Sequence, residues 1–161
     1  VPALVLIGKR WEETGSGIEV EHLFSEIVKR IMRDCTSEIE TPRNSKPVLL
    51  ASIGDEQHCL AIHALAAALA EENIASHFLG ARTPVEAVAE MVRKTHPPVV
   101  FLWAQLSKNA QYEAITALPT LRPAPRVILG GPGWDAVRVS DATFVDTLFQ
   151  ACDLIGTTLG K

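Results

Sequence analysis

Hydrophobic and polar residues follow two different patterns along this chain, and the change falls near residue 41. Before it, the segment "IEVEHLFSEIVKRIMRDC" carries apolar side chains at helical spacing, with charged residues on the opposite side. The apolar positions of this stripe are Ile18, Leu23, Phe24, Ile27, Val28 and Ile31. Thr14–Gly17 is typical of a turn from an earlier helix that contains Trp11. The pattern predicts a helical part over residues 1–40.

After a polar linker that contains a proline, short apolar runs alternate with helical segments. The runs predict strands at 47–53, 75–80, 97–104, 126–131 and 142–145. The intervening segments predict helices at 58–72, 83–95, 108–117 and 146–158. The second of these helices opens with Thr83 as N-cap and Pro84 at its first turn. Such alternation predicts a flavodoxin-like or Rossmann-like domain with a five-stranded parallel sheet over residues 41–161.

The two N-terminal helices have one apolar stripe each, which is too little to form a core alone. We therefore expect them to be part of a helical bundle, packed either on further helices upstream or on the domain that follows. The chain begins without methionine, and we expect it to be a piece of a longer protein.

Composition narrows the possible partners and the compartment. The net charge of −4 argues against this chain alone binding a nucleic-acid backbone, which requires a basic surface. Cys35, Cys59 and Cys152 show no CxxC spacing, which favours reduced thiols in a cytoplasmic protein. No apolar run reaches the roughly 18–20 residues of a membrane span, so we expect no membrane partner.

In a doubly wound sheet, ligands bind beyond the carboxyl ends of the strands. The loops predicted at these ends are Gly54–His58, Leu79–Thr83, Ala104–Asn109 and Gly130–Trp134. The strong metal ligand among them is His58. Glu56 is placed to accept its second ring N–H and fix the tautomer, and Asp55 competes for that role.

A single histidine in a loop does not by itself define a site. Most loop histidines such as His58 are solvated and bind nothing. A catalytic base would need a partner, and Ser107 is the hydroxyl placed for it. A zinc site would need about three or four ligands, which these loops do not offer. The GxG at Gly131–Gly133 follows the fourth strand rather than the first, which disfavours conventional dinucleotide binding.

Taken together, the loops resemble those of cobalamin-binding domains, which carry D-x-H-x-x-G after strand one, S-x-L after strand three and G-G after strand four. The corresponding segments here are Glu56-Gln57-His58-Cys59-Leu60-Ala61, Ala104-Gln105-Leu106 and Gly130-Gly131, at similar separations. Glu56 keeps the carboxylate of the pattern. Ala61 replaces a glycine, and Ala104 replaces a serine hydroxyl.

The resemblance implies a role for each loop. His58 would displace the cofactor's own base as the lower ligand of cobalt, with Glu56 behind it. An apolar slot beside the sheet would take the displaced nucleotide tail, and Gly130 and Gly131 would let it approach the backbone. The other cofactor contacts that it implies in these loops are Gln57, Cys59, Leu60, Leu79, Gly80, Thr83, Ala104, Leu106 and Ser107.

The N-terminal helices add a second resemblance. "WEETGSGIEVEH" resembles the W-x9-E-H motif of cobalamin-dependent photoreceptor regulators, the CarH/LitR type of the MerR superfamily. It implies that a helical bundle covers the upper face of cobalt and that Trp11, Ile18, Glu21 and His22 contact an adenosyl group. Glu12 stands where some of these regulators carry a histidine that binds cobalt after illumination.

The sequence therefore predicts an adenosylcobalamin-binding, light-sensing domain of a transcriptional regulator, which is not an enzyme. Light would change its oligomeric state, with a homo-oligomer as one form, and DNA would be bound through a domain absent from this chain. The alternative is a corrinoid carrier or the cobalamin-binding subunit of a methyltransferase or mutase. That alternative shares the His58 loop and Gly130-Gly131. A flavodoxin-like signalling domain without a cofactor is a third possibility.

Overall fold

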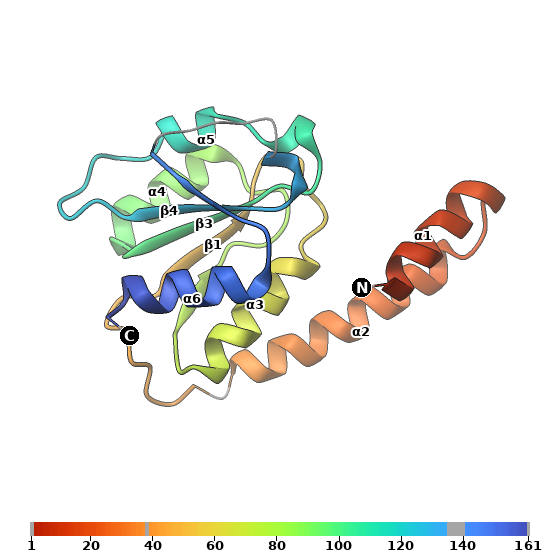
Figure 1. The fold of residues 1–161 in the computed structure, drawn as a ribbon, viewed down its shortest axis with the longest axis horizontal. Coiled ribbons are helices and arrows are strands. Elements are labelled where there is room, and N and C mark those ends of the chain that lie inside the picture. The colour runs from red at the N-terminus through yellow and green to blue at the C-terminus, as the bar shows by residue number, and fades with distance from the viewer. Residues whose placement is uncertain (1, 38, 135–140, 161) are drawn as a thin grey trace.

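The predicted five-stranded parallel sheet is confirmed by the computed structural model, which describes residues 2–37, 39–134 and 141–160 (Figure 1). The strands are β1 (Val48–Ser52), β2 (Ser76–Phe78), β3 (Val99–Trp103), β4 (Arg126–Gly130) and β5 (Thr143–Val145). Their order in the sheet is β2-β1-β3-β4-β5, with every neighbouring pair parallel. The order reverses between β1 and β3, which places the expected ligand site at the carboxyl ends of these two strands.

Both faces of the sheet are covered by helices. Helices α3 (Leu60–Glu71) and α6 (Leu148–Thr158) lie on one face, and α4 (Val85–Thr95) and α5 (Glu113–Thr116) lie on the other (Figure 1). Alternate residues of a strand point to opposite faces, so Leu50 packs toward α3 and Leu49 toward α4. All of β1 is buried, as expected for a central parallel strand.

Two predicted helix details are wrong. The helix expected at 108–117 is a 3-10 turn, η1 (Ser107–Asn109), followed by the short α5, because the chain bends here to bring Asn109 inward. Thr83 is not the N-cap of α4, since Pro84 occupies that position and Val85 is the first helical residue. The amide of Thr83 donates to the carbonyl of Ser52, and its hydroxyl to that of Gly80, so this residue extends the sheet edge instead.

The N-terminal segment forms a hairpin of α1 (Pro2–Thr14) and α2 (Ile18–Thr36). Gly15 and Gly17 make the turn with φ values of 67° and 96°. The C-terminal part of α2 packs on α3, and the rest of the hairpin extends away from the sheet (Figure 1). The α2–α3 contact surrounds His63, whose ring lies edge-on to Phe78 with centroids 4.4 Å apart. Burial and the positive charges of α2 lower the pKa of His63 to about 4, so this contact holds a neutral imidazole near pH 7.

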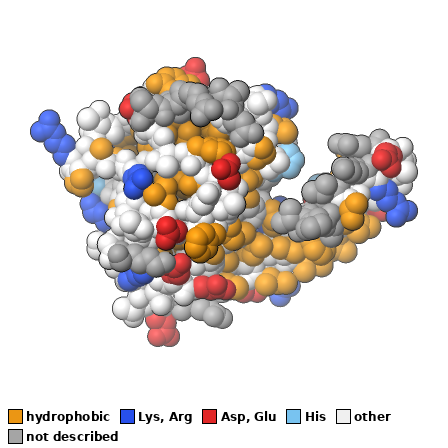
Figure 2. Space-filling model, viewed as in Figure 1, with side chains coloured by type: hydrophobic (Ala, Val, Ile, Leu, Met, Phe, Trp, Pro, Cys, Tyr) orange, Lys and Arg blue, Asp and Glu red, His pale blue; other side chains and the backbone are white. Residues whose placement is uncertain are grey.

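The apolar stripe predicted on α2 is mostly exposed. Its side chains lie 37% to 66% exposed at Ile18, Leu23, Phe24, Ile27 and Ile31, whereas Val28 is half-buried. Figure 2 shows the resulting run of hydrophobic surface along α2. The half-buried residues of α2 include Val28, Lys29 and Met32. Of the two packing partners expected from the sequence, the following domain leaves most of this stripe uncovered among the described residues.

Among the helices in the described ranges, none has both the length and the apolar character that a membrane crossing requires.

Candidate functional site

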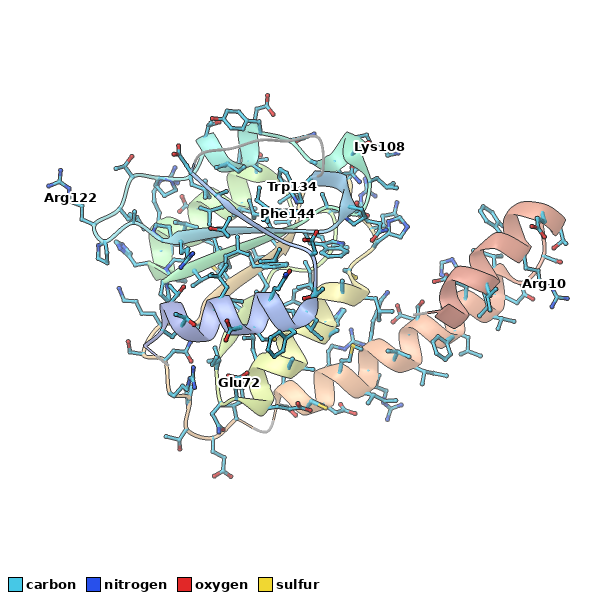
Figure 3. All side chains as sticks on the ribbon, in the orientation of Figure 1. Arg10, Glu72, Lys108, Arg122, Trp134 and Phe144 are labelled. Atoms are coloured by element: carbon cyan, nitrogen blue, oxygen red, sulfur yellow. The ribbon has the colours of Figure 1, made fainter. Side chains whose placement is uncertain are left out.

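The loops at the carboxyl ends of the strands face the α1–α2 hairpin across an open hollow (Figure 2). Lys108, in the loop after β3, marks this end of the sheet, and Arg122 lies at the opposite end (Figure 3). The loop of residues 54–59 follows β1 at the same edge, next to the β3 loop. The hollow is therefore lined by these loops on one side and by the hairpin on the other.

Glu56 joins the two loops and is fully buried. Its Oε1 accepts from the backbone N–H of His58 at 2.9 Å and lies 2.5 Å from Nδ1 of the same residue. Its Oε2 accepts from the amides of Gln105 and Leu106 at 2.9 and 3.0 Å, and from Nδ2 of Asn109 at 3.0 Å. One carboxylate thus holds the β3 loop against the β1 loop and orients the imidazole.

This environment keeps Glu56 ionised. Burial alone would raise the pKa of Glu56, but hydrogen bonds from Asn109, His58 and Leu106 outweigh it and lower the pKa to about 2. An ionised carboxylate can only accept, so Nδ1 of His58 carries the proton of the shared hydrogen bond. With the proton on Nδ1, the other nitrogen of the neutral ring, Nε2, carries a lone pair. The side chain of His58 is 59% exposed. The arrangement offers one pre-oriented nitrogen to a ligand in the hollow.

Asp55 does not take part in this arrangement. Its side chain is 80% exposed and forms an ion pair with Arg82 at 3.2 Å. Arg82 also donates its backbone N–H to the carbonyl of Glu56 at 2.8 Å, which ties the loop after β2 to the loop after β1. Of the two carboxylates proposed from the sequence, the structure places Glu56 beside His58.

The glycines after β4 serve the packing of the chain itself. A Cβ at Gly130 would overlap the ring of Phe101, and a Cβ at Gly131 would overlap the carbonyl oxygen of Ala104. Gly131 also has φ +101°, a conformation that favours glycine. The amide of Gly133 then donates to the carbonyl of Ala104 at 3.0 Å. These glycines let the β4 loop approach the β3 loop directly.

We therefore expect Gly131→Ala to lower the free energy of unfolding by at least about 2 kcal/mol, because it combines backbone strain with an overlap against backbone. Gly80→Ala is the matched control, since Gly80 has φ +90° but nothing within 4 Å of an added Cβ. It should cost only about 1 kcal/mol. Urea unfolding of both variants measures the difference, and equal losses would contradict the packing role of Gly131.

The other predicted contacts divide into three groups. Gln57 and Cys59 lie in the His58 loop, Leu60 begins α3, and Leu106 and Ser107 follow β3; Cys59 is buried and Leu106 is 40% exposed. Leu79, Gly80 and Thr83 belong to the loop after β2. Leu79 and Thr83, together with Arg82, line a separate pocket beside α4. Ala104 is fully buried in the core toward α4 and α5, so its side chain is not presented to the hollow.

The contacts predicted on the hairpin lie in α1 (Trp11) and α2 (Ile18, Glu21 and His22). Trp11 is 44% exposed and Ile18 37% exposed, and His22 is exposed as well. Glu21 is half-buried, with Oε1 accepting from the hydroxyl of Ser25 at 2.7 Å. The side chain of Glu12 lies outside the described residues. Figure 1 shows α1 and the first part of α2 standing clear of the sheet.

Two residues of this region were missed by sequence reasoning. Asn109 is 3% exposed and closes the set of donors around Glu56. Trp103 ends β3 and packs on the α3–α6 face of the sheet, with Nε1 buried and without a partner among the described residues. An amide in a loop and an aromatic at a strand end are both common, so only the pairing of the β1 and β3 loops singles them out.

No protein-family model and no curated protein matches this sequence. The fold is nevertheless similar to solved structures. One is a cobalamin-binding protein from Desulfitobacterium hafniense DCB-2, with TM-score 0.56 and 18% identity over 98% of this chain and 78% of that chain. Another belongs to the methanol:cobalamin methyltransferase complex MtaBC from Methanosarcina barkeri, with TM-score 0.60 and 15% identity over 98% of this chain. The match spans only 64% of that second chain. These likenesses define the fold as the Rossmann-like α/β architecture of cobalamin-binding domains, with the helical hairpin included in the match.

Proposed function

We propose that this chain binds a corrinoid cofactor, cobalamin, with Nε2 of His58 as the lower ligand of cobalt. The observation that carries the proposal is the His58–Glu56 pair, in which a buried carboxylate orients an exposed imidazole through Nδ1 and leaves Nε2 available to a ligand. A corrin ring already supplies four nitrogens to its metal, so one protein nitrogen is enough to complete the lower side. The similarity of the fold to cobalamin-binding structures supports the same conclusion.

The donor set of the described residues fits this ligand. When bound, cobalamin supplies a cobalt ion whose upper position can carry an alkyl group. Glu56 keeps the proton on Nδ1 of His58, so the ring presents Nε2 as a neutral donor. Asn109 and the amides of the β3 loop hold Glu56 in place, which keeps the carboxylate beside the imidazole that would bind cobalt.

For the role of the cofactor, we propose a corrinoid carrier, the module that presents a cobalt-bound group to a partner enzyme. The match to a chain of the MtaBC complex supports this role, and it includes the helical hairpin as well as the sheet domain.

The second candidate is the light sensor predicted from the sequence, an adenosylcobalamin-binding domain of a CarH/LitR-like transcriptional regulator. The W-x9-E-H pattern favours it: Trp11, Glu21 and His22 all belong to the α1–α2 hairpin, the segment that would cover an upper adenosyl group. DNA binding would then belong to another part of the full-length protein.

The carrier and the light sensor differ in whether the upper group on cobalt controls the oligomeric state of the protein. We expect the chain to take up both methylcobalamin and adenosylcobalamin, seen as comigration of corrin absorbance with protein in gel filtration. A carrier should keep the same oligomeric state in the dark and after green light. A light-dependent change of oligomeric state, confined to the adenosyl form, would favour the sensor. A protein that retains neither corrinoid would refute cobalamin binding altogether.

A further inference from the structure

One side chain lies where the nucleotide tail of a corrinoid would be expected to enter. Trp103 is the last residue of β3 and stands in register with Ser52 on β1 and Gly130 on β4. Its side chain belongs to the face of the sheet that α3 and α6 cover. Its ring atom Cδ2 lies 3.2 Å from the place that a Cβ would take at Gly131. The indole therefore lies against the second of the two glycines after β4.

The space over these glycines is occupied by the chain itself. The ring of Phe101 fills the side of Gly130, and the indole of Trp103 fills the side of Gly131. By the resemblance of the loops, a displaced tail would approach the backbone at Gly130 and Gly131, and the indole of Trp103 lies beside these residues. Indole and the benzimidazole of a cobalamin tail are flat bicyclic rings of similar size, so both cannot occupy one slot.

Shape rather than hydrogen bonding holds the indole in this position. Nε1 of Trp103 is buried without a partner among the described residues, and so is Oγ of Ser52, its neighbour on β1. Native proteins pair most of their buried polar atoms, so such exceptions are informative. Packing against Gly131 and its neighbours, and not a hydrogen bond among the described residues, therefore fixes the indole. Removing the indole breaks no hydrogen bond of the described residues.

We infer that Trp103 is a built-in plug of the tail slot, so that this chain favours corrinoids whose nucleotide tail is missing or stays outside the protein. The inference rests on the proposed binding of a corrinoid through His58. It assigns to Trp103 a role in selecting among corrinoids, separate from the metal ligation by His58. A smaller residue at position 103 should open the slot to the complete cofactor.

The test compares two corrinoids with exchangeable axial ligands, diaquocobinamide, which has no tail, and hydroxocobalamin, which has one. His58 has to displace the base of hydroxocobalamin in any variant, so the change in the ratio of the two dissociation constants is the readout. Trp103→Ala should tighten hydroxocobalamin at least about tenfold relative to diaquocobinamide. Trp103→Phe, which keeps a smaller ring, should shift this ratio in the same direction by less. This variant replaces Trp103→Ala in the comparison if the alanine variant folds poorly.

Trp134→Phe is the matched control, because Trp134 is 1% exposed and also has an unpaired Nε1, but packs on the opposite face of the sheet. It should leave the ratio unchanged. An unchanged ratio in both Trp103 variants overturns the plug while leaving corrinoid binding intact. Failure of the wild-type chain to bind either corrinoid overturns the proposed function and the plug together.

Discussion

Replacing His58 by alanine is expected to weaken corrinoid binding at least about tenfold, because it removes the exposed imidazole that Glu56 orients for a ligand. The corrinoid that still binds should carry its own base or water below the cobalt. Absorption spectra report this change of ligand. For the reduced cob(II)alamin form, electron paramagnetic resonance of 15N-labelled protein reports whether the ligating nitrogen comes from the chain.

The control for this variant is His96→Asn. His96 is exposed after α4 and has φ 48°, a conformation that asparagine tolerates. It should bind the corrinoid as the wild type does, with the nitrogen splitting of the labelled protein intact. A His58→Ala protein that keeps the isotope-dependent splitting would show that another side chain is the lower ligand.

Replacing Glu56 by glutamine is expected to lower the free energy of unfolding by about 3 kcal/mol at pH 7. The carboxylate accepts five hydrogen bonds, and an amide would point an N–H₂ group at donors on one side or the other. The folded protein lowers the pKa of Glu56 from 4.5 to about 2, and a shift of this size corresponds to a similar energy. Urea unfolding at neutral pH measures the loss.

The pH dependence provides a second check on Glu56. Because its pKa is lower in the folded state, its contribution is complete above about pH 4.5 and is lost as the pH falls toward 2. The stability difference between wild type and Glu56→Gln should therefore shrink on acidification through this window. Asp55→Asn is the control: its exposed ion pair with Arg82 should change stability by less than about 1 kcal/mol. Equal losses for the two variants would contradict the special role of Glu56.

The architecture was largely predictable because it depends on local patterns. Buried parallel strands need continuous apolar runs, and the runs that contain β1, β3 and β4 are long enough to be unambiguous. The helix predicted at 108–117 was wrong. The sequence of this segment has helical character, but Asn109 donates to the buried carboxylate of Glu56, and this contact draws Asn109 inward and interrupts the helix. The apolar stripe of α2 was recognised correctly as a pattern, but periodicity alone does not tell which neighbour, if any, covers it.

The candidate site was predictable in part. The place of His58 after the first strand and the motif spacing identified it as a ligand, and that assignment stays a prediction. The motif favoured Glu56 over Asp55 as the partner of His58, although two adjacent carboxylates alone do not decide between them. Neighbouring residues in a loop point in different directions, and only the folded chain brings a set of N–H donors to one of them.

By itself, the sequence determined the order of strands and helices and the loop in which a histidine could meet a ligand, since both follow from short-range spacing. Only the tertiary structure decided how that histidine is held and what lies beside it. The donors to Glu56 from the β3 loop are 49 to 53 residues away along the chain. Likewise, strand alternation turns Trp103 toward α3 and α6 and Ala104 toward α4 and α5, and the approach of Gly131 fills the remaining space. Contacts between segments so far apart depend on the packing of the whole sheet, which no local pattern encodes.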